Sequence, residues 1–170
     1  MKIKKKIVLI GMMGSGKSTI GCLTAKKLKK KFIDTDKIIE KETNLTILEI
    51  FKQKGEFFFR SLEENVILKI LNSSDNIISI GGGAFLNEKI RKEILKQDIS
   101  IWLKWKNQIL LKRIKNSKKR PIILDLNENE ILNIINHRSK IYSKSKFKIN
   151  CNGLTKDKIA NKIIKIYENH

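Results

Sequence analysis

Five short runs, apolar throughout or in part, recur along the chain, and glycine or polar residues end them. The first, at 7–10, reads Ile-Val-Leu-Ile and ends at Gly11, which is typical of a strand buried on both faces of a parallel sheet. The remaining strands are expected at 32–33, closed by Asp34, and at 76–80, 99–105 and 147–150. These runs therefore predict five strands.

Apolar residues recur at helical spacing in the segments between these runs. Residues 18–31 place apolar side chains on one face and lysines on the other. Residues 37–71 lack strand alternation and are interrupted by Asn44 and Gly55, so we expect two or three helices there, forming an inserted lobe. Further helices are predicted at 87–96, 107–115, 128–144 and 156–167.

The alternation of strands and helices predicts a three-layer α/β/α fold around a five-stranded parallel sheet. With 170 residues the chain has the length of one domain, so we expect a single domain over 1–170 with a helical substrate-binding lobe at about 35–72. The polar, basic segment at about 116–127 holds the only proline, Pro121, and its composition is typical of a surface loop. We expect this segment to form a lid.

The composition narrows the class of protein. The formal net charge is +20, from 37 lysines and arginines against 17 aspartates and glutamates, but the lysines are spread along the whole chain and we expect no nucleic-acid partner. The two cysteines, Cys22 and Cys151, belong to no CxxC or Cys/His cluster, which argues against a zinc site or a disulfide framework. No run approaches the roughly 20 apolar residues that span a bilayer. We expect a soluble, cytoplasmic monomer without a membrane partner.

The segment 11–18 reads GMMGSGKS and follows the first predicted strand. Its glycines let the backbone curl so that N–H groups and the N-terminus of the next helix face phosphate oxygens. Lys17 is expected to bridge the β- and γ-phosphates and Ser18 to offer its hydroxyl to Mg²⁺. A plain glycine-rich turn is the alternative, but the flanking strand and helix favour a phosphate-binding loop. The other nucleotide-binding residues expected in it are Gly14, Ser15, Gly16 and Thr19.

Two carboxylates, Asp34 and Asp36, follow the second predicted strand. Ligands of open α/β folds bind at this edge of the sheet. Asp34 is a candidate for the magnesium site, and Asp36 for accepting a hydrogen bond from an attacking hydroxyl, orienting it and taking its proton. The alternative is that one of them only caps the next helix.

Glycines and arginines supply the remaining candidates. Residues 81–83 are three consecutive glycines after an apolar strand; they would let a small polar substrate lie against backbone N–H groups, or form a simple turn. Arg60 and Glu63 are three apart on one helical face, so the acid can orient the guanidinium. The planar fork of arginine suits a carboxylate or phosphate, although each arginine can also be a solvated surface charge. The arginines are Arg60, Arg91, Arg113, Arg120 and Arg138.

Taken in order, six motifs over nearly the whole chain resemble the shikimate kinase family, within the P-loop NTPase fold. They are GMMGSGKST at 11–19, DTD at 34–36, FFFRSLE around Arg60, GGG at 81–83, RP at 120–121 and HRSKIY around Arg138. The resemblance implies an ATP-dependent phosphotransferase that transfers the γ-phosphoryl group to the 3-hydroxyl of shikimate, a step towards chorismate and the aromatic amino acids.

The resemblance also implies roles for the shikimate side of the site. Asp36 would hold the reacting hydroxyl, while Arg60 and Arg138 would clamp the carboxylate. Glu63 would support Arg60. Gly82 and Gly83 would offer backbone contacts.

On the nucleotide side, Ser18 and Asp34 would serve Mg²⁺ by the same resemblance. The catalytic residues would be Lys17, Asp36 and Arg120. Of these, Arg120 would close with the lid over the ATP phosphates. Arg113 would lie against the adenine. Family members often carry a basic residue after the last strand where this chain has Asn152-Gly153, so we expect only main-chain groups of 151–153 to border the base.

Two other functions compete with this interpretation. One is another small P-loop kinase, acting on gluconate or on a nucleoside monophosphate. The other is a non-enzymatic protein that binds nucleotide or nucleic acid. A carboxylate-bearing acceptor requires Arg60 and Arg138 to converge with Asp36 in one pocket, and this requirement separates the hypotheses.

Overall fold

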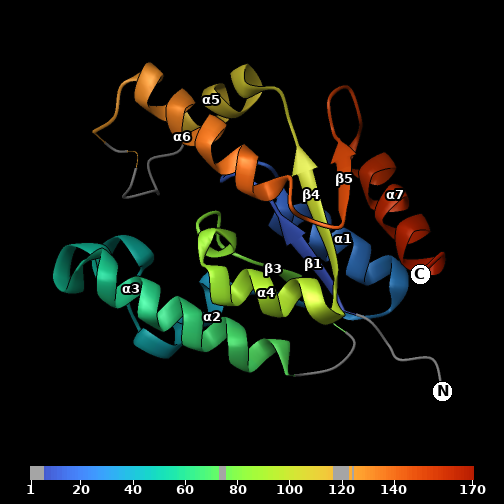
Figure 1. Ribbon diagram of the computed structural model, residues 1–170, viewed down its shortest axis with the longest axis horizontal. Helices are drawn as coiled ribbons and strands as arrows, with labels where there is room; N and C mark the ends of the chain where they lie inside the picture. Colours follow the sequence, from blue (N-terminus) through green and yellow to red (C-terminus); the bar gives the residue numbers. More distant parts are fainter. Residues whose placement is uncertain (1–5, 73–75, 117–122, 124) are drawn as a thin grey trace.

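A twisted, parallel five-stranded sheet forms the centre of the molecule (Figure 1). The computed structural model describes residues 6–72, 76–116, 123 and 125–170. The strand order is β2-β3-β1-β4-β5, and the five predicted strands are confirmed. The strands are β1 (Ile7–Ile10), β2 (Lys31–Asp34), β3 (Asn76–Ser79), β4 (Ile99–Lys104) and β5 (Phe147–Asn150).

The central strand β1 explains why the phosphate loop sits in the middle of the sheet. All four of its residues are fully buried, and it pairs on one side with β3 and on the other with β4, with Leu9 opposite Ser79 and Ile101. The chain leaves β1 at the carboxyl edge, where β2 and β3 also end. Residues that follow these three strands therefore meet at one edge of the sheet.

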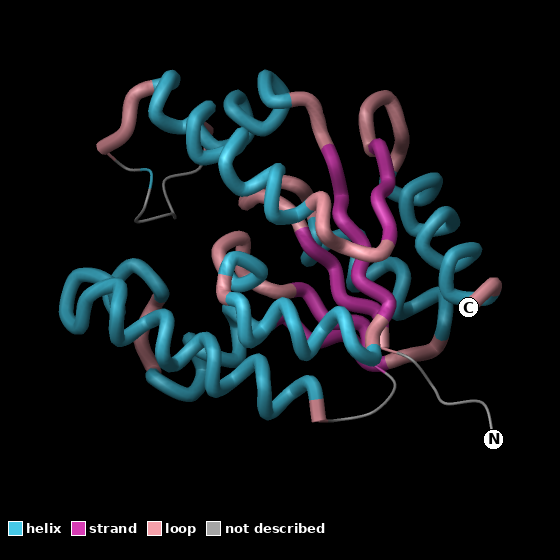
Figure 2. The backbone as a smooth tube through the Cα atoms, in the orientation of Figure 1, coloured by secondary structure: helices cyan, strands magenta, loops and turns pink. Residues whose placement is uncertain are grey.

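Helices cover both faces of the sheet, which confirms the three-layer prediction (Figure 2). One face packs on α1 and α7 through residues such as Leu9, Ile20 and Ile159. The opposite face packs on α4, α5 and α6, with Ile10 and Ile135 among its buried residues. In the described part of the chain, no helix is long and apolar enough to cross a membrane. The helices are α1 (Lys17–Leu28), α2 (Thr35–Thr43), α3 (Ile47–Leu71), the short 3₁₀ helix η1 (Ala84–Leu86), α4 (Glu88–Gln97), α5 (Asn107–Lys115), α6 (Glu128–Tyr142) and α7 (Lys156–Glu168).

The predicted end of the first helix is wrong. We expected it to reach residue 31, but α1 stops at Leu28 because Lys29 adopts a left-handed conformation with φ 52°. The next residue, Lys30, donates its N–H to the Ala25 carbonyl, which closes the helix end. Lys31 already belongs to β2. The predicted end of α6 is also two residues too long, since that helix stops at Tyr142.

Helices α2 and α3 form the predicted helical lobe beside the sheet. Asn44 ends α2 with φ 53°, and Gly55 interrupts α3 with φ 82°, so both sequence signals mark real breaks. The lobe has a hydrophobic cluster of its own that includes Ile39, Ile50 and Phe59. Its boundaries at about 35–72 remain a prediction. Most of the predicted lid, including 117–122 and residue 124, lies outside the described residues.

Gly21 of α1 provides a test of the packing between this helix and the sheet. A Cβ at this position would lie 2.5 Å from Phe32 Cε2 and 3.0 Å from Leu9 Cδ1. We expect Gly21→Ala to destabilise the protein by about 1–2 kcal/mol, because overpacking typically costs about 1–3 kcal/mol and exceeds the helix propensity gained, roughly 0.5–1 kcal/mol. Urea unfolding followed by circular dichroism measures the change, with the exposed neighbour substitution Cys22→Ala as the control. An unfolding free energy equal to or above that of the wild type would contradict the packing described.

Candidate active site

The segment between β1 and α1 forms a loop that lines one side of a polar cavity. Gly14 and Gly16 have φ of 75° and 84°, conformations that glycine adopts without strain. Lys17 is buried, and its Nζ donates to the carbonyls of Gly11 at 2.8 Å and Met12 at 3.0 Å. Its positive charge and the N-terminus of α1 therefore lie together at the loop. This phosphate cavity has a lining that includes Gly14, Gly16, Lys17, Ser18, Thr19, Asp34, Asp36, Gly81 and Gly82.

Ser15 differs from the other predicted loop residues. Its side chain is completely buried, and its Oγ has no hydrogen-bond partner in the part of the chain that the structure describes. It does not line the cavity in front of the loop but borders another one behind it. Ser15 can therefore contribute to the phosphate cavity, in front of the loop, only through its backbone.

Asp34 makes two kinds of contact at once. Its Oδ2 accepts a hydrogen bond from Ser18 Oγ at 2.5 Å, while its Oδ1 accepts from the backbone N–H groups of Asp36 and Lys37 at 3.2 and 3.5 Å. It thus caps α2, as the alternative expected, and this helix begins at Thr35 rather than at residue 37. The other oxygen of Asp34 contacts the Ser18 hydroxyl, and its role at the magnesium site stays a prediction.

The pair Ser18 and Asp34 fits a magnesium ion. A hydroxyl and a carboxylate oxygen are hard ligands, which Mg²⁺ prefers. Within residues 6–72, 76–116, 123 and 125–170 there is no group of three or more His, Cys, Asp or Glu side chains that could hold a metal ion. Magnesium usually binds through one or two carboxylates together with substrate phosphates and water, so a sparse protein site beside a phosphate loop is the expected arrangement.

A second cavity lies next to the phosphate cavity. It has apolar walls, where the rings of Phe51 and Phe59 lie 4.8 Å apart, and a charged end. The two cavities share Asp36, Gly81 and Gly82. The lining of the second cavity brings together all the residues predicted for the substrate, namely Asp36, Arg60, Glu63, Gly82, Gly83 and Arg138.

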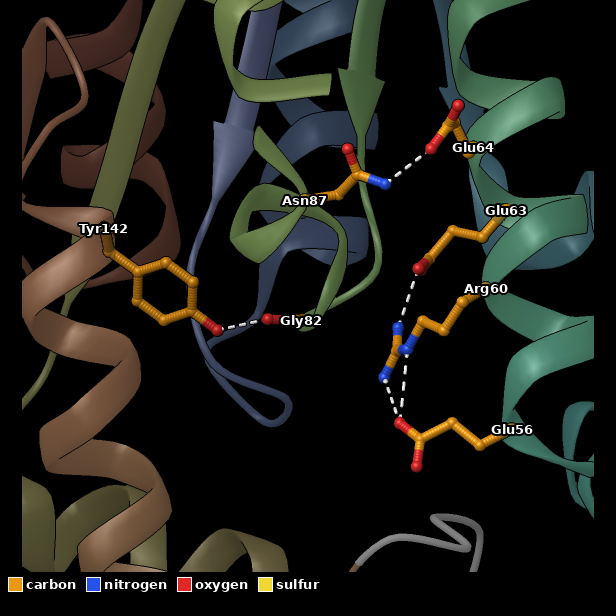
Figure 3. A network of polar contacts seen from close by, with 7 residues as sticks. All are labelled: Glu56, Arg60, Glu63, Glu64, Gly82, Asn87 and Tyr142. Atoms are coloured by element: carbon orange, nitrogen blue, oxygen red, sulfur yellow. Dashed lines mark hydrogen bonds and ion pairs between the residues drawn. The ribbon is translucent and has the colours of Figure 1, made fainter. Parts of the chain in front are cut away.

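Two carboxylates of α3 hold Arg60 (Figure 3). Its Nη1 donates to Glu63 Oε2 at 2.7 Å, and its Nε and Nη2 donate to Glu56 Oε1 at 3.3 and 3.4 Å. Glu63 was predicted, whereas Glu56 was missed, although its position four residues before Arg60 is the usual spacing for such a pair. Burial raises the pKa of Glu63, the nearby Arg60 charge opposes that shift, and the charge of Asp36 adds to it.

Helix α6 supplies the other arginine and a tyrosine that the sequence analysis did not use. Arg138 is buried, and its Nη1 lies 3.8 Å from Met12 Sδ. One turn later, the Tyr142 hydroxyl donates to the Gly82 carbonyl (Figure 3). Burial raises the pKa of Tyr142 to about 12, so this hydroxyl remains a donor at neutral pH. Helix α6 therefore positions Arg138 and fixes the backbone of the glycine loop.

A third cavity lies behind the phosphate loop. Arg113 lies with its Cζ 4.0 Å from the ring centre of Trp105, and its Nη1 donates to the Gly14 carbonyl at 3.1 Å. Leu154, Thr155 and Lys156 line this cavity, and the expectation that main-chain groups of 151–153 border the base stays a prediction. Asn152 Oδ1 accepts from the N–H of Lys106, the residue that precedes α5, at 2.9 Å.

The structure describes two of the three predicted catalytic residues. Lys17 and Asp36 line the phosphate cavity, whereas Arg120 lies outside the described residues. The predicted Arg91 has another use, because its Nη1 donates to the carbonyls of Phe85 and Leu86 at 3.0 and 2.9 Å. It supports η1 and is not among the residues that line either of the two adjoining cavities.

A phosphate loop at the centre of a 2-3-1-4-5 parallel sheet, joined to an acceptor pocket, defines a P-loop kinase. The family model described as shikimate kinase matches residues 13–168. The chain belongs to the shikimate kinase family and is an ATP-dependent phosphotransferase.

Individual relatives agree with this assignment. The chain is 39% identical to a shikimate kinase of Bartonella quintana, covering 98% of this chain and 80% of the relative, and 40% identical to one of Bacillus pumilus, covering 95% and 88%. Among solved structures, shikimate kinase from Acinetobacter baumannii in complex with shikimate matches with a TM-score of 0.92 at 28% identity, over 98% of this chain and 94% of that one. Deoxyadenosine kinase from M. mycoides, at 17% identity, a TM-score of 0.64 and coverage of 97% and 100%, shares the fold alone.

Proposed function

We propose that this chain transfers the γ-phosphoryl group of ATP to the 3-hydroxyl of shikimate, giving shikimate 3-phosphate and ADP. The observation that carries the proposal is the junction of the two cavities, because the phosphate cavity and the pocket with Arg60 and Arg138 share Asp36. Phosphoryl transfer requires donor and acceptor to meet in line at one point. The relative from Acinetobacter baumannii, solved in complex with shikimate, supports the choice of acceptor.

The acceptor pocket suits a small cyclic acid. Arg60 and Arg138 lie at its charged end and bind the carboxylate, since guanidinium groups recognise carboxylates through paired hydrogen bonds. Glu63 and Glu56 hold Arg60 in place for this contact. The apolar walls pack against the carbon ring, and Gly82 and Gly83 let the substrate approach the backbone.

Asp36 orients the reacting hydroxyl and accepts its proton. The oxygen of that hydroxyl attacks the γ-phosphorus, the bond from this phosphorus to the β,γ-bridging oxygen breaks, and ADP leaves. Lys17 supplies positive charge beside the phosphates, where negative charge is redistributed in the transition state. Arg120, on the predicted lid, is expected to add a second charge there.

Ser18 and Asp34 would hold Mg²⁺ with ATP. When bound, the ion neutralises charge on the phosphate oxygens. The contact between the Ser18 hydroxyl and Asp34 at 2.5 Å keeps both ligands close together before nucleotide arrives. The protein therefore contributes two prearranged oxygen ligands, and the phosphates contribute the others.

An ADP-release assay with different acceptors tests this function. The protein is mixed with Mg-ATP and either shikimate, gluconate or nucleoside monophosphates, and ADP is measured by a coupled reaction. We expect rapid release with shikimate only. Release with one of the other acceptors would favour another small kinase, and an unchanged slow rate with every acceptor would favour a non-enzymatic nucleotide binder.

Gly83 gives a steric test of the acceptor pocket. A Cβ there would lie 2.5 and 2.6 Å from Nη1 and Nη2 of Arg60, while the backbone conformation, φ −92°, suits alanine. We expect Gly83→Ala to displace the guanidinium and raise KM for shikimate roughly tenfold or more, because a hydrogen bond to a charged group is worth about 1.5–3 kcal/mol. Steady-state kinetics measure both substrates, and KM for ATP is the internal control. A parallel rise in both KM values would contradict a local effect on Arg60.

A further inference from the structure

Trp105 follows the end of β4 and has no part in the function proposed above. Its half-buried indole ring lies between the phosphate loop and α5. The indole Nε1–H donates to the Ser15 carbonyl at 2.9 Å, although the two residues are 90 positions apart. The same ring contacts the Arg113 guanidinium at 4.0 Å. One side chain therefore touches both the phosphate loop and a residue of the cavity behind it.

The hydrogen bond to Ser15 determines the direction of a backbone N–H in the loop. A trans peptide is planar, so its C=O and N–H point in opposite directions. With the Ser15 carbonyl turned towards Trp105, the N–H of Gly16 points away from Trp105. Gly16 lines the phosphate cavity and is the residue before the first turn of α1. The indole thus holds this peptide in the orientation that a phosphate-binding loop needs.

The neighbouring peptide is held in a similar way. The Gly14 carbonyl accepts from Arg113 Nη1 at 3.1 Å, and the Ser15 N–H of the same peptide donates to the Met12 carbonyl at 3.1 Å. Arg113 is exposed, so without a neighbour its long side chain would sample many rotamers. Contact with the Trp105 ring fixes the plane of the guanidinium. Two successive carbonyls of the loop are therefore held by the pair Trp105 and Arg113.

We propose that Trp105 is a positioning residue for the nucleotide. Its indole N–H orients the Ser15–Gly16 peptide for the phosphates, and its ring holds Arg113 at the edge of the cavity that receives the rest of the nucleotide. The proposal rests on the nucleotide half of the proposed function and not on the identity of the acceptor. It can therefore be tested with ADP alone.

Substitutions at Trp105 separate the two contacts. Trp105→Phe keeps an aromatic ring and removes the N–H donor, whereas Trp105→Leu removes both. We expect the first to weaken ADP binding about 3- to 10-fold, the size of one neutral hydrogen bond, and the second to weaken it a further ~2- to 5-fold through loss of the cation–π contact. Isothermal titration calorimetry without acceptor measures the affinity. The control is Trp102→Phe, because Trp102 packs near Tyr142 and does not line the nucleotide cavities.

Fluorescence provides a second readout, because the emission of Trp105 would not respond to ADP if this residue only stabilised the fold. The chain has two tryptophans, so Trp102→Phe leaves Trp105 as the sole indole. We expect ADP to change its emission with the same Kd that calorimetry gives. Arg113→Lys in this background should reduce the change, since the guanidinium no longer covers the ring.

Some outcomes would overturn the proposal. Wild-type ADP affinity in both Trp105→Phe and Trp105→Leu would do so, as would emission that is silent to saturating ADP. If Trp105→Leu fails to fold, Trp105→Phe still decides the hydrogen-bond contribution, with its unfolding midpoint measured alongside. Normal ADP binding by the wild type together with no turnover of shikimate would instead count against the proposed acceptor and leave this inference standing.

Discussion

We expect Asp36→Asn to lower kcat by about 10²- to 10⁴-fold, the usual contribution of a positioned proton acceptor. Asp36 is half-buried at the junction of the two cavities, and its Oδ1 would lie 2.9 Å from a Cβ placed on Gly81, so its carboxylate packs closely against the glycine loop. Asparagine keeps the size of the side chain and removes its capacity to take a proton. Both KM for ATP and the affinity for ADP should change little if Asp36 acts on the acceptor hydroxyl, as proposed above.

A charge-matched control excludes a general electrostatic effect. Asp157→Asn removes the same charge at an exposed position of α7, where the carboxylate pairs with Lys27 at 2.9 Å. This variant should have wild-type kcat. Initial rates at saturating ATP and shikimate measure both proteins. If Asp36→Asn retained more than about a tenth of wild-type turnover, Asp36 would not be the proton acceptor.

The second large effect is expected for Arg60→Lys. Lysine keeps the positive charge but cannot offer two parallel N–H groups to a carboxylate, and it cannot contact Glu56 and Glu63 simultaneously in the same way. A hydrogen bond to a charged group contributes about 1.5–3 kcal/mol, so KM for shikimate should rise roughly 10- to 100-fold. KM for ATP should remain near the wild-type value.

Arg91→Lys is the matched control for this prediction. Arg91 is a half-buried arginine that also makes two hydrogen bonds, but its partners are the carbonyls of Phe85 and Leu86. This substitution should reduce stability and leave KM for shikimate almost unchanged. Equal increases in KM for the two variants would indicate a general disturbance of the glycine loop and its surroundings, and would contradict a direct role of Arg60 in binding.

The sequence predicted the centre of the sheet well because β1 is a continuous, buried apolar run. β1 and β5 have the predicted bounds, 7–10 and 147–150. The end of α1 could not be predicted in the same way, since Lys29 takes a left-handed conformation that is uncommon for a residue other than glycine. Nothing in the local sequence KKLKKK distinguishes this lysine from its neighbours.

The phosphate loop and the acceptor residues were predictable because their motifs are local. The supporting residues were harder to find, since their partners are remote in sequence: Tyr142 contacts Gly82, 60 positions away, and Trp105 contacts Ser15, 90 positions away. Glu56 is an exception, because its position four residues before Arg60 is a local signal for an ion pair on a helix. The role of Arg120, the lid, the monomeric state and the cytoplasmic location stay predictions.

The divided contacts of Asp34 have a thermodynamic consequence. One carboxylate connects Ser18, at the start of α1, with the backbone N–H of Asp36, in the first turn of α2. A nucleotide that moves Asp34 or changes its charge therefore also affects Asp36, beside the acceptor pocket, through this one carboxylate. Coupling of this kind is reciprocal, so whatever factor the donor applies to acceptor affinity, the acceptor applies to donor affinity. Each substrate is thus expected to change the affinity for the other, even though the two bind in different cavities.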